Sequence, residues 1–217
     1  RVVNAEIPLA DVLGRHFPWC ASWADQLREL FAGYVAAKQA QNVLDYDNLL
    51  LYWARAAAHP VLAEDIGGRF DHVMVDEYQD TNRLQASILM ALKPRGEGLT
   101  VVGDDAQAIY SFRAATVRNI LEFPRRFTPA AKIITLDRNY RSTEPILAAA
   151  NGVIDLASER FTKNLWTDRR SAEKPRLVTV RDEAEQARYI AESVLANREA
   201  GARLKQQAVL FRATHHS

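Results

Sequence analysis

The stretch VMVDEYQDT, residues 73–81, is the most informative part of this sequence. It opens with a short β-prone apolar run and then changes abruptly to two adjacent acids, Asp76 and Glu77. A short apolar run bounded by polar residues is typical of a buried strand, so we expect a strand over residues 72–75. Ligands collect at the carboxyl ends of parallel strands, and the two carboxylates are therefore the first candidates for chemistry.

Two neighbouring acids at a strand end suit the hydrolysis of a nucleoside triphosphate. Such an enzyme must hold Mg²⁺ against the β- and γ-phosphates and orient an attacking water. Because adjacent side chains diverge where a strand ends, Asp76 could face the metal while Glu77 acts as the general base. The alternative is a polar strand end that caps the following helix, and an Asp-Glu pair alone does not decide between the two.

Strands and helices alternate along the rest of the chain. Upstream, we expect two amphipathic helices, over residues 23–38 with Ser22 as the N-cap and over residues 47–58, and a chain break at Gly67-Gly68. Downstream, the pattern predicts strands at 99–102, 132–136, 176–180 and 208–211, and helices at 82–92, 115–123, 145–157 and 183–200. This alternation predicts an α/β fold, with parallel sheets covered by flanking helices and an N-terminal helical segment in front.

The composition limits the class of protein. The 217 residues are enough for one α/β domain or two small ones, and a formal net charge of +1 means that any DNA-binding surface must be local. Cys20 is the single cysteine, which excludes an internal disulfide framework and fits a reducing, cytoplasmic compartment. No apolar stretch approaches the roughly 20 residues of a membrane-spanning helix. Since the chain opens on Arg1 and stops just after an apolar strand, we expect it to be an internal piece of a longer protein.

Three motifs carry a family resemblance. Residues 76–82, DEYQDTN, resemble the second signature motif of the UvrD/Rep/PcrA-type superfamily 1 DNA helicases. Residues 102–113, VGDDAQAIYSFR, resemble the third motif of that family, and residues 136–143, LDRNYRST, resemble the fourth. Weaker similarity at residues 44–50, 163–168 and 209–212 extends the resemblance over nearly all of the chain after about Tyr34.

For the nucleotide, the resemblance implies ATP and Mg²⁺ as cofactors. Asp76 would bind Mg²⁺, Glu77 would activate water, and Gln107 would contact the γ-phosphate and report its presence to the DNA side. Tyr140 would stack on the adenine, and Arg141 would reach the γ-phosphate as an arginine finger. A guanidinium suits this role because it stays charged and its fork matches phosphate oxygens. An ordinary surface glutamine and an ordinary surface turn are the alternatives for Gln107 and for residues 139–142.

For the DNA, the resemblance implies single-stranded DNA and duplex junctions as partners and movement in the 3′ to 5′ direction. Tyr110, Phe112 and Arg113 would lie on the single-strand path, with Phe112 as a stacking platform and Arg113 contacting a phosphate or base. Stacking tolerates any base sequence and contributes roughly 1–3 kcal/mol per base. The alternative is that Tyr110 and Phe112 are core residues below a turn.

The resemblance also implies an incomplete RecA-like fold of the P-loop NTPase type. Residues 1–40 would be a helical remnant of an accessory subdomain, residues 41–138 the C-terminal part of a first motor domain, and residues 139–217 the N-terminal part of a second. The family's usual Gly after the Phe-Arg pair is replaced by Ala114, and Ala108 stands where Ser is common.

No Gly-x-x-x-x-Gly-Lys-Ser/Thr string occurs in the sequence, so we expect that this chain does not hydrolyse ATP by itself. Two alternatives to a simple helicase remain open: a motor fused to a nuclease, and a non-hydrolysing DNA-binding module. Against the second alternative stand four retained residues, Asp76, Glu77, Gln107 and Arg141, which a silent module has no need to keep.

Overall fold

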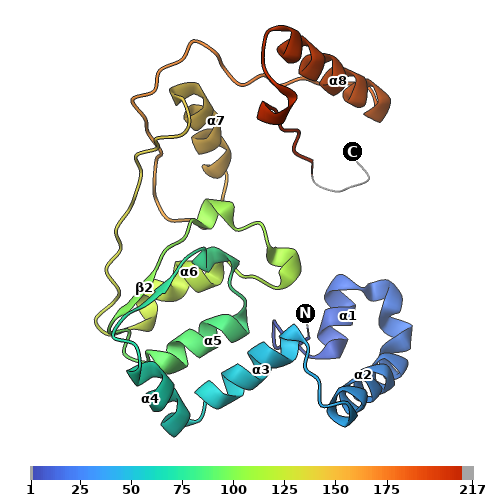
Figure 1. Ribbon diagram of the computed structural model, residues 1–217, viewed down its shortest axis with the longest axis vertical. Helices are drawn as coiled ribbons and strands as arrows, with labels where there is room; N and C mark the ends of the chain where they lie inside the picture. The colour runs from blue at the N-terminus through green and yellow to red at the C-terminus, as the bar shows by residue number, and fades with distance from the viewer. Residues whose placement is uncertain (1, 212–217) are drawn as a thin grey trace. The chain divides into compact units, whose positions relative to one another are not determined.

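The computed structural model describes residues 2–211, and of Arg113 only the main chain. The chain divides into two compact units (Figure 1). The first contains residues 1–139 and 150–166, and the second contains residues 140–149 and 167–217. Each unit is described by itself below.

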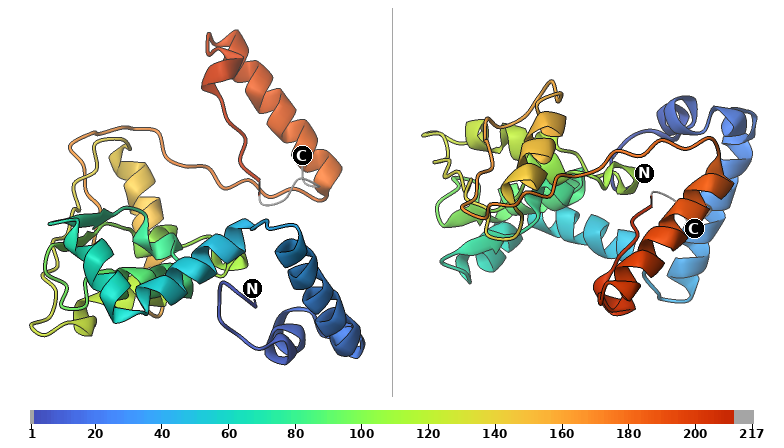
Figure 2. Two further views of the ribbon diagram at one scale, coloured as in Figure 1. Left: turned by 60° about the horizontal axis from the view of Figure 1, so that its bottom comes forward. Right: turned by 90° about the horizontal axis from the view of Figure 1, so that it is seen from above.

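The first unit begins with a group of helices: α1 (Leu9–His16), the 3-10 helix η1 (Pro18–Trp23) and α2 (Ala24–Ala40). α1 and α2, drawn in blue in Figure 2, contact each other and η1. The predicted helix over residues 23–38 is confirmed as α2, whereas α1 was not predicted. The prediction of Ser22 as its N-cap is wrong, because Ser22 lies inside η1 and the N-cap position belongs to Trp23.

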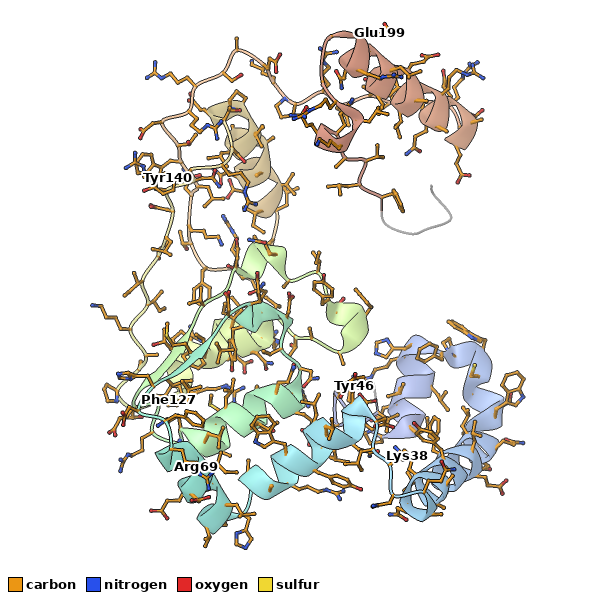
Figure 3. All side chains as sticks on the ribbon, viewed as in Figure 1. Lys38, Tyr46, Arg69, Phe127, Tyr140 and Glu199 are labelled. Carbon is orange, nitrogen blue, oxygen red and sulfur yellow. The ribbon has the colours of Figure 1, made fainter. Side chains whose placement is uncertain are left out.

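α3 (Tyr46–Ala57) confirms the second predicted helix and starts at a well-bonded cap. The Asp45 carboxylate accepts hydrogen bonds from the Asn48 amide at 2.8 Å and from Lys38 Nζ at 2.6 Å. The hydrogen bond from Lys38 and those from the Asn48 amide and from Tyr34 lower the pKa of Asp45 to about 2. Lys38 on α2 and Tyr46 at the start of α3 are both labelled in Figure 3. This cap therefore ties the N-terminal helices to α3.

α4 (Pro60–Gly68) corrects the expected chain break, because Gly67 and Gly68 are its last two residues. A Cβ atom on Gly67 would lie 2.4 Å from the carbonyl oxygen of Leu92. The missing side chain thus allows α4 to approach the end of α5 (Arg83–Leu92) closely. α3 and α4 both pack beside α5 (Figure 1).

A parallel pair of strands lies at the centre of this unit. β1 (Val73–Val75) and β2 (Leu99–Val101) pair in parallel with Val73 opposite Leu99, and α5 connects them. Both strands and this helix were predicted. α6 (Arg118–Glu122) is shorter than the helix predicted over residues 115–123, because Ala115 forms a β-bridge with Asn82. Four 3-10 helices complete the unit: η2 (Tyr78–Asp80), η3 (Asp105–Gln107), η4 (Ser111–Arg113) and η5 (Phe123–Arg126).

The core of the unit lies directly under the end of β1. Tyr78, Ile120 and Phe123 form a buried cluster, and the rings of Tyr78 and Phe123 meet edge to face with centroids 5.3 Å apart. Val75, Leu99 and Val101 from the two strands pack against this cluster. The packed core therefore holds the main chain at the end of β1, directly before the two acids.

Three predicted strands are wrong for the described residues. Residues 132–136, 176–180 and 208–211 form no strand, although all three segments are rich in β-prone residues. A strand exists only where a neighbouring strand supplies donors and acceptors for its main chain, and no strand pairs with these segments in the described part of the chain. Their large apolar side chains are accordingly exposed, up to 94% for Leu177. A second parallel sheet is thus not observed within residues 2–211.

Two long helices occupy the C-terminal part of the chain. α7 (Glu144–Ile154) confirms the helix predicted over residues 145–157 and runs across the division between the units. α8 (Glu183–Glu199) confirms the helix predicted over residues 183–200, with Asp182 as its N-cap, and a 3-10 helix, η6 (Leu204–Gln206), follows it. Within residues 2–211, every helix is too short or too polar to cross a lipid bilayer.

Candidate functional site at the strand ends

Asp76 and Glu77 follow β1 directly, as predicted, and both side chains are exposed. Asp76 Oδ1 accepts a hydrogen bond from the Glu77 amide at 2.9 Å. Glu77 has φ 50° and ψ 41°, in the left-handed region. A side chain in that region costs about 1–2 kcal/mol, and such strain concentrates at functional sites. The chain therefore turns sharply at Glu77, and the packing of Tyr78 below it holds the turn in place.

Gln79 holds the Glu77 carboxylate. Its side chain is only 1% exposed, and its Nε2 donates to Glu77 Oε2 at 2.6 Å. The other end of the same amide, Oε1, accepts from the Asp104 main-chain amide at 3.0 Å. Sequence reasoning gave Gln79 no role. Its place in the second motif was visible, but its burial beside a carboxylate required the structure.

Gly103 allows this bridge between the two strand ends. A Cβ atom at Gly103 would lie 2.5 Å from Gln79 Oε1 and 2.8 Å from Ile120 Cδ1. The neighbouring main chains are also joined, since the Tyr78 amide donates to the Val102 carbonyl oxygen at 3.0 Å. Only glycine leaves room for the buried Gln79 amide at this position.

The Asp104 carboxylate accepts hydrogen bonds from Gln107, the candidate phosphate sensor, and from a lysine. Gln107 Nε2 donates to Asp104 Oδ2 at 2.9 Å, and Lys163 Nζ donates to Asp104 Oδ1. Burial raises the pKa of Asp104, but the hydrogen bonds from Lys163 and Gln107 outweigh burial and hold this pKa below its ordinary value. Asp104 therefore remains charged at neutral pH and fixes the Gln107 carboxamide at the end of β2.

Lys163 is a second residue that sequence reasoning missed. Besides Asp104, its Nζ lies 3.7 Å from Asp105 Oδ1, and the Phe161 amide donates to Asp105 Oδ2 at 3.0 Å. The segment around Lys163 thus closes over the two acids that follow β2. The signal was present, because Lys163 opens one of the stretches that resemble the family, but that weak similarity assigned no partner.

The candidate DNA-binding aromatics lie outside the buried core cluster. Phe112 is 62% exposed and Tyr110 is 36% exposed, and their rings are 5.6 Å apart between centroids with a tilt of 39°. The side chain of Arg113 is outside the described structure. Ala114, which stands at the family's usual glycine, has φ 65° and is buried. The alanine that replaces the family's usual glycine therefore carries its methyl group on a main chain in the left-handed region.

The aromatic segment is anchored to the acid segment through α6. Asn119, a buried residue of α6, donates from Nδ2 to the Thr81 carbonyl oxygen at 3.0 Å and to the Asn82 carbonyl oxygen at 3.2 Å. The Thr116 amide donates to the Thr81 carbonyl oxygen at 3.2 Å. A displacement of residues 77–82 would thus be passed to the residues that follow Phe112.

Tyr140 and Arg141 belong to the second unit, whereas Asp76, Glu77 and Gln107 belong to the first. Both side chains are exposed, Tyr140 by 73% (labelled in Figure 3). Arg169 supports their main chain, since its Nη1 donates to the carbonyl oxygens of Tyr140, at 3.2 Å, and of Arg141. In this segment the fold holds the main chain and leaves both side chains accessible.

The residues at the strand ends suit a hard cation that also binds phosphate. Asp76 offers carboxylate oxygen at the end of β1, and oxygen is the ligand type that Mg²⁺ prefers. Among residues 2–211 no group of three or more His, Cys, Asp and Glu side chains could enclose a metal ion. Mg²⁺ is usually held by one or two carboxylates together with water and substrate phosphates.

A parallel strand pair with acids at its carboxyl end belongs to the α/β class of ligand-binding folds, and comparison with known proteins identifies the family. Residues 20–128 match the UvrD/REP helicase N-terminal domain, and residues 134–217 match the UvrD-like helicase C-terminal domain. The chain belongs to the UvrD/REP helicase family. Membership implies a RecA-like fold, and the structure shows a two-stranded parallel sheet, β1–β2, with helices beside it.

Curated relatives agree with this family. The chain is 35% identical, over 189 residues, to the ATP-dependent DNA helicase PcrA of Staphylococcus epidermidis. It is 34% identical over the same length to the protein of that name from Staphylococcus aureus (strain COL). Each alignment covers 87% of this chain and 26% of the relative, so the chain spans about a quarter of the length of the relatives it matches.

Proposed function

We propose that this chain is part of an ATP-dependent DNA helicase that couples ATP hydrolysis to 3′ to 5′ movement on single-stranded DNA and to the opening of duplex junctions, in the cytoplasm. The observation that carries the proposal is the connected set at the strand ends. Glu77 is bonded to Gln79, Gln79 to the Asp104 amide, and the Asp104 carboxylate to Gln107. The candidate base and the candidate phosphate sensor are thereby held in one network.

In the hydrolysis step, each residue has a distinct task. Asp76 would hold Mg²⁺, which when bound neutralises charge on the β- and γ-phosphates. Glu77 would orient the attacking water and accept its proton as the water oxygen bonds to the γ-phosphorus and the bond to the departing ADP breaks. Gln107 would contact the γ-phosphate, and its contact would be lost when phosphate leaves.

Coupling to DNA would run through the segment that carries Tyr110, Phe112 and Arg113. Exposed rings suit base stacking, and an arginine adds a phosphate or base contact. Asn119 and Thr116 tie the residues behind this segment to Thr81, four residues after Glu77. A change at the nucleotide thus has a direct main-chain route to the DNA.

The second motor domain, from residue 139, would contribute Tyr140 to the adenine and Arg141 to the γ-phosphate, and the first would include residues 41–138. An arginine supplied from a facing domain makes hydrolysis depend on closure of the nucleotide cleft. The chain as given carries no phosphate-binding Gly-x-x-x-x-Gly-Lys-Ser/Thr loop, and we infer that it does not turn over ATP by itself.

The test is Glu77→Gln in the complete protein that contains this chain. DNA-stimulated ATP hydrolysis should fall by about 10²–10⁴-fold, while binding of a fluorescent ATP analogue stays within about twofold. Glu64→Gln, an exposed glutamate on α4, is the matched control and should hydrolyse ATP at the wild-type rate. Hydrolysis within a few-fold of wild type in Glu77→Gln would remove Glu77 from the role of base.

A further inference from the structure

The Gln79 amide connects groups from both strand ends while buried between them. Its nitrogen donates to Glu77 Oε2 and its oxygen accepts from the Asp104 amide, so both ends of a 1% exposed side chain are used. A buried amide with both ends bonded has one orientation, because a flip would set donor against donor and acceptor against acceptor. Gln79 is thus a rigid link between β1 and β2 ends.

Glu77 needs such a link because its side chain is long and exposed. A glutamate carries three side-chain torsions, and fixing them costs on the order of 1–2 kcal/mol. A general base works only when its oxygen lies within hydrogen-bond reach of the proton that it accepts. The hydrogen bond from Gln79 to Oε2 limits the torsions that the Glu77 side chain can adopt, and it therefore restricts the direction of Oε1.

We propose that Gln79 is a positioning residue for hydrolysis: it orients the Glu77 carboxylate and ties that orientation to the end of β2, where Asp104 holds Gln107. This inference rests on the proposed function. Asp104 provides this link. Its main-chain amide bonds to Gln79, and its carboxylate accepts a hydrogen bond from Gln107 at 2.9 Å. Movement of Gln107 would therefore reach the base through three hydrogen bonds and two residues, Asp104 and Gln79.

Packing provides the competing explanation, since a buried Gln79 also fills space beside Gly103 and Ile120. The two explanations differ in what they predict. Loss of packing lowers stability together with the affinity for nucleotide and DNA. Loss of positioning lowers kcat and leaves the affinity for ATP unchanged, because Gln79 acts on the ligand only through Glu77.

The experiment compares Gln79→Met and Gln79→Glu with wild type in the complete protein. Gln79→Met keeps the length of the side chain and removes both hydrogen bonds, whereas Gln79→Glu keeps an acceptor for the Asp104 amide and replaces the donor to Glu77 with a second carboxyl group. Both should lower kcat for DNA-stimulated ATP hydrolysis by about 10–100-fold, the usual effect of removing a supporting hydrogen bond. KM for ATP should stay within about twofold.

Gln85→Met is the matched control. Gln85 is a half-buried glutamine six residues away whose oxygen accepts from the Asn82 amide in the cap of α5, and it should keep the wild-type kcat. Introducing Gln79→Met into Glu77→Gln should cause no further loss of kcat, since the carboxylate to be positioned is already gone.

The outcomes separate the two proposals. A wild-type protein without DNA-stimulated hydrolysis would overturn the proposed function and this inference with it. An active wild type in which Gln79→Met and Gln79→Glu keep kcat within twofold would overturn the inference alone. So would a loss of kcat that is matched by losses of melting temperature and nucleotide affinity, or one that adds fully to the loss in Glu77→Gln.

Discussion

The strand-end site of the first unit and the Tyr140–Arg141 segment of the second are held in different ways. At the strand ends the fold holds the side chains themselves, since Glu77 and Gln107 are each bonded to a partner within the site. Around Tyr140 the fold holds the main chain through Arg169 and exposes the side chains. The candidate catalytic groups of the first region are thus bonded within their site, whereas those of the second region have exposed side chains.

Arg141→Ala tests the Tyr140–Arg141 segment, and it has the largest expected effect on ATP hydrolysis. If Arg141 reaches the γ-phosphate, its removal in the complete protein should lower kcat of ATP hydrolysis by about 10³-fold or more. The folding of the chain should not change, because Arg141 is exposed. Steady-state hydrolysis and thermal melting measure the two effects.

Arg170→Ala provides the control for Arg141→Ala. Arg170 is an exposed arginine beside Arg169, and its loss removes the same charge from the same unit. It should leave kcat within about twofold of wild type. Equal losses in the two variants would mean that net charge, and not an arginine finger, supports hydrolysis.

Lys163→Met tests how the strand-end site is held, through the pH dependence of the free energy of unfolding. The pKa of Asp104 is lowered in the folded protein from an ordinary value of 3.8, so Asp104 stabilises the fold above that value and the contribution is lost as pH falls below it. Removing Lys163 should therefore cost about 1–2 kcal/mol in the free energy of unfolding at pH 7. The cost should shrink as pH falls below 3.8, because the unfolded chain then binds a proton on Asp104 and the folded chain resists it.

Urea unfolding of this chain at pH 7 and pH 3 measures the effect of Lys163→Met. Lys132→Met, an exposed lysine of the same unit, is the control and should change stability by less than about 0.5 kcal/mol at either pH. A cost at pH 3 equal to that at pH 7 would show that the aliphatic stem of Lys163, and not its charge on Asp104, stabilises the site.

Sequence patterns predicted those parts of the fold that depend on neighbours close in the chain. β1, β2 and α5 were predicted because an apolar run, a turn and a periodic helix identify themselves locally. Residues 132–136, 176–180 and 208–211 have the same composition and form no strand, since a strand also needs a partner. Composition reports that a segment is able to pair, and it does not report that a partner is present.

In the candidate site, too, local features could be predicted and contacts between distant segments could not. Asp76 and Glu77 were proposed from residue type and position after a strand, and Gln107 from its place in the third motif. Gln79 and Lys163 were assigned no role, although both hold site residues in the structure. Their contribution lies in contacts across the fold, 25 residues apart for Gln79 and Asp104 and 59 for Lys163 and Asp104. No local pattern encodes such a contact.

Ala114→Gly has the smallest expected effect and concerns the loop that carries Phe112. Ala114 has φ 65°, a conformation that costs a side chain about 1–2 kcal/mol and costs glycine little. Removing its buried methyl group costs about 0.8 kcal/mol. A glycine also adds about 0.5–1 kcal/mol of freedom to the unfolded chain. The relief of strain is therefore largely offset, and the free energy of unfolding should change by less than about 0.5 kcal/mol, measured by urea unfolding of this chain.

Ala106→Gly separates the relief of strain at Ala114 from the general effect of glycine. Ala106 lies in η3, at the same site but outside the left-handed region, so a glycine there adds freedom to the unfolded chain and should lower stability by about 0.5–1 kcal/mol. A smaller loss of stability at Ala114 than at Ala106 would show that Ala114 stores strain beside the exposed aromatics. A loss at Ala114 equal to or larger than that at Ala106 would mean that the methyl group of Ala114 contributes more by packing than its backbone conformation costs.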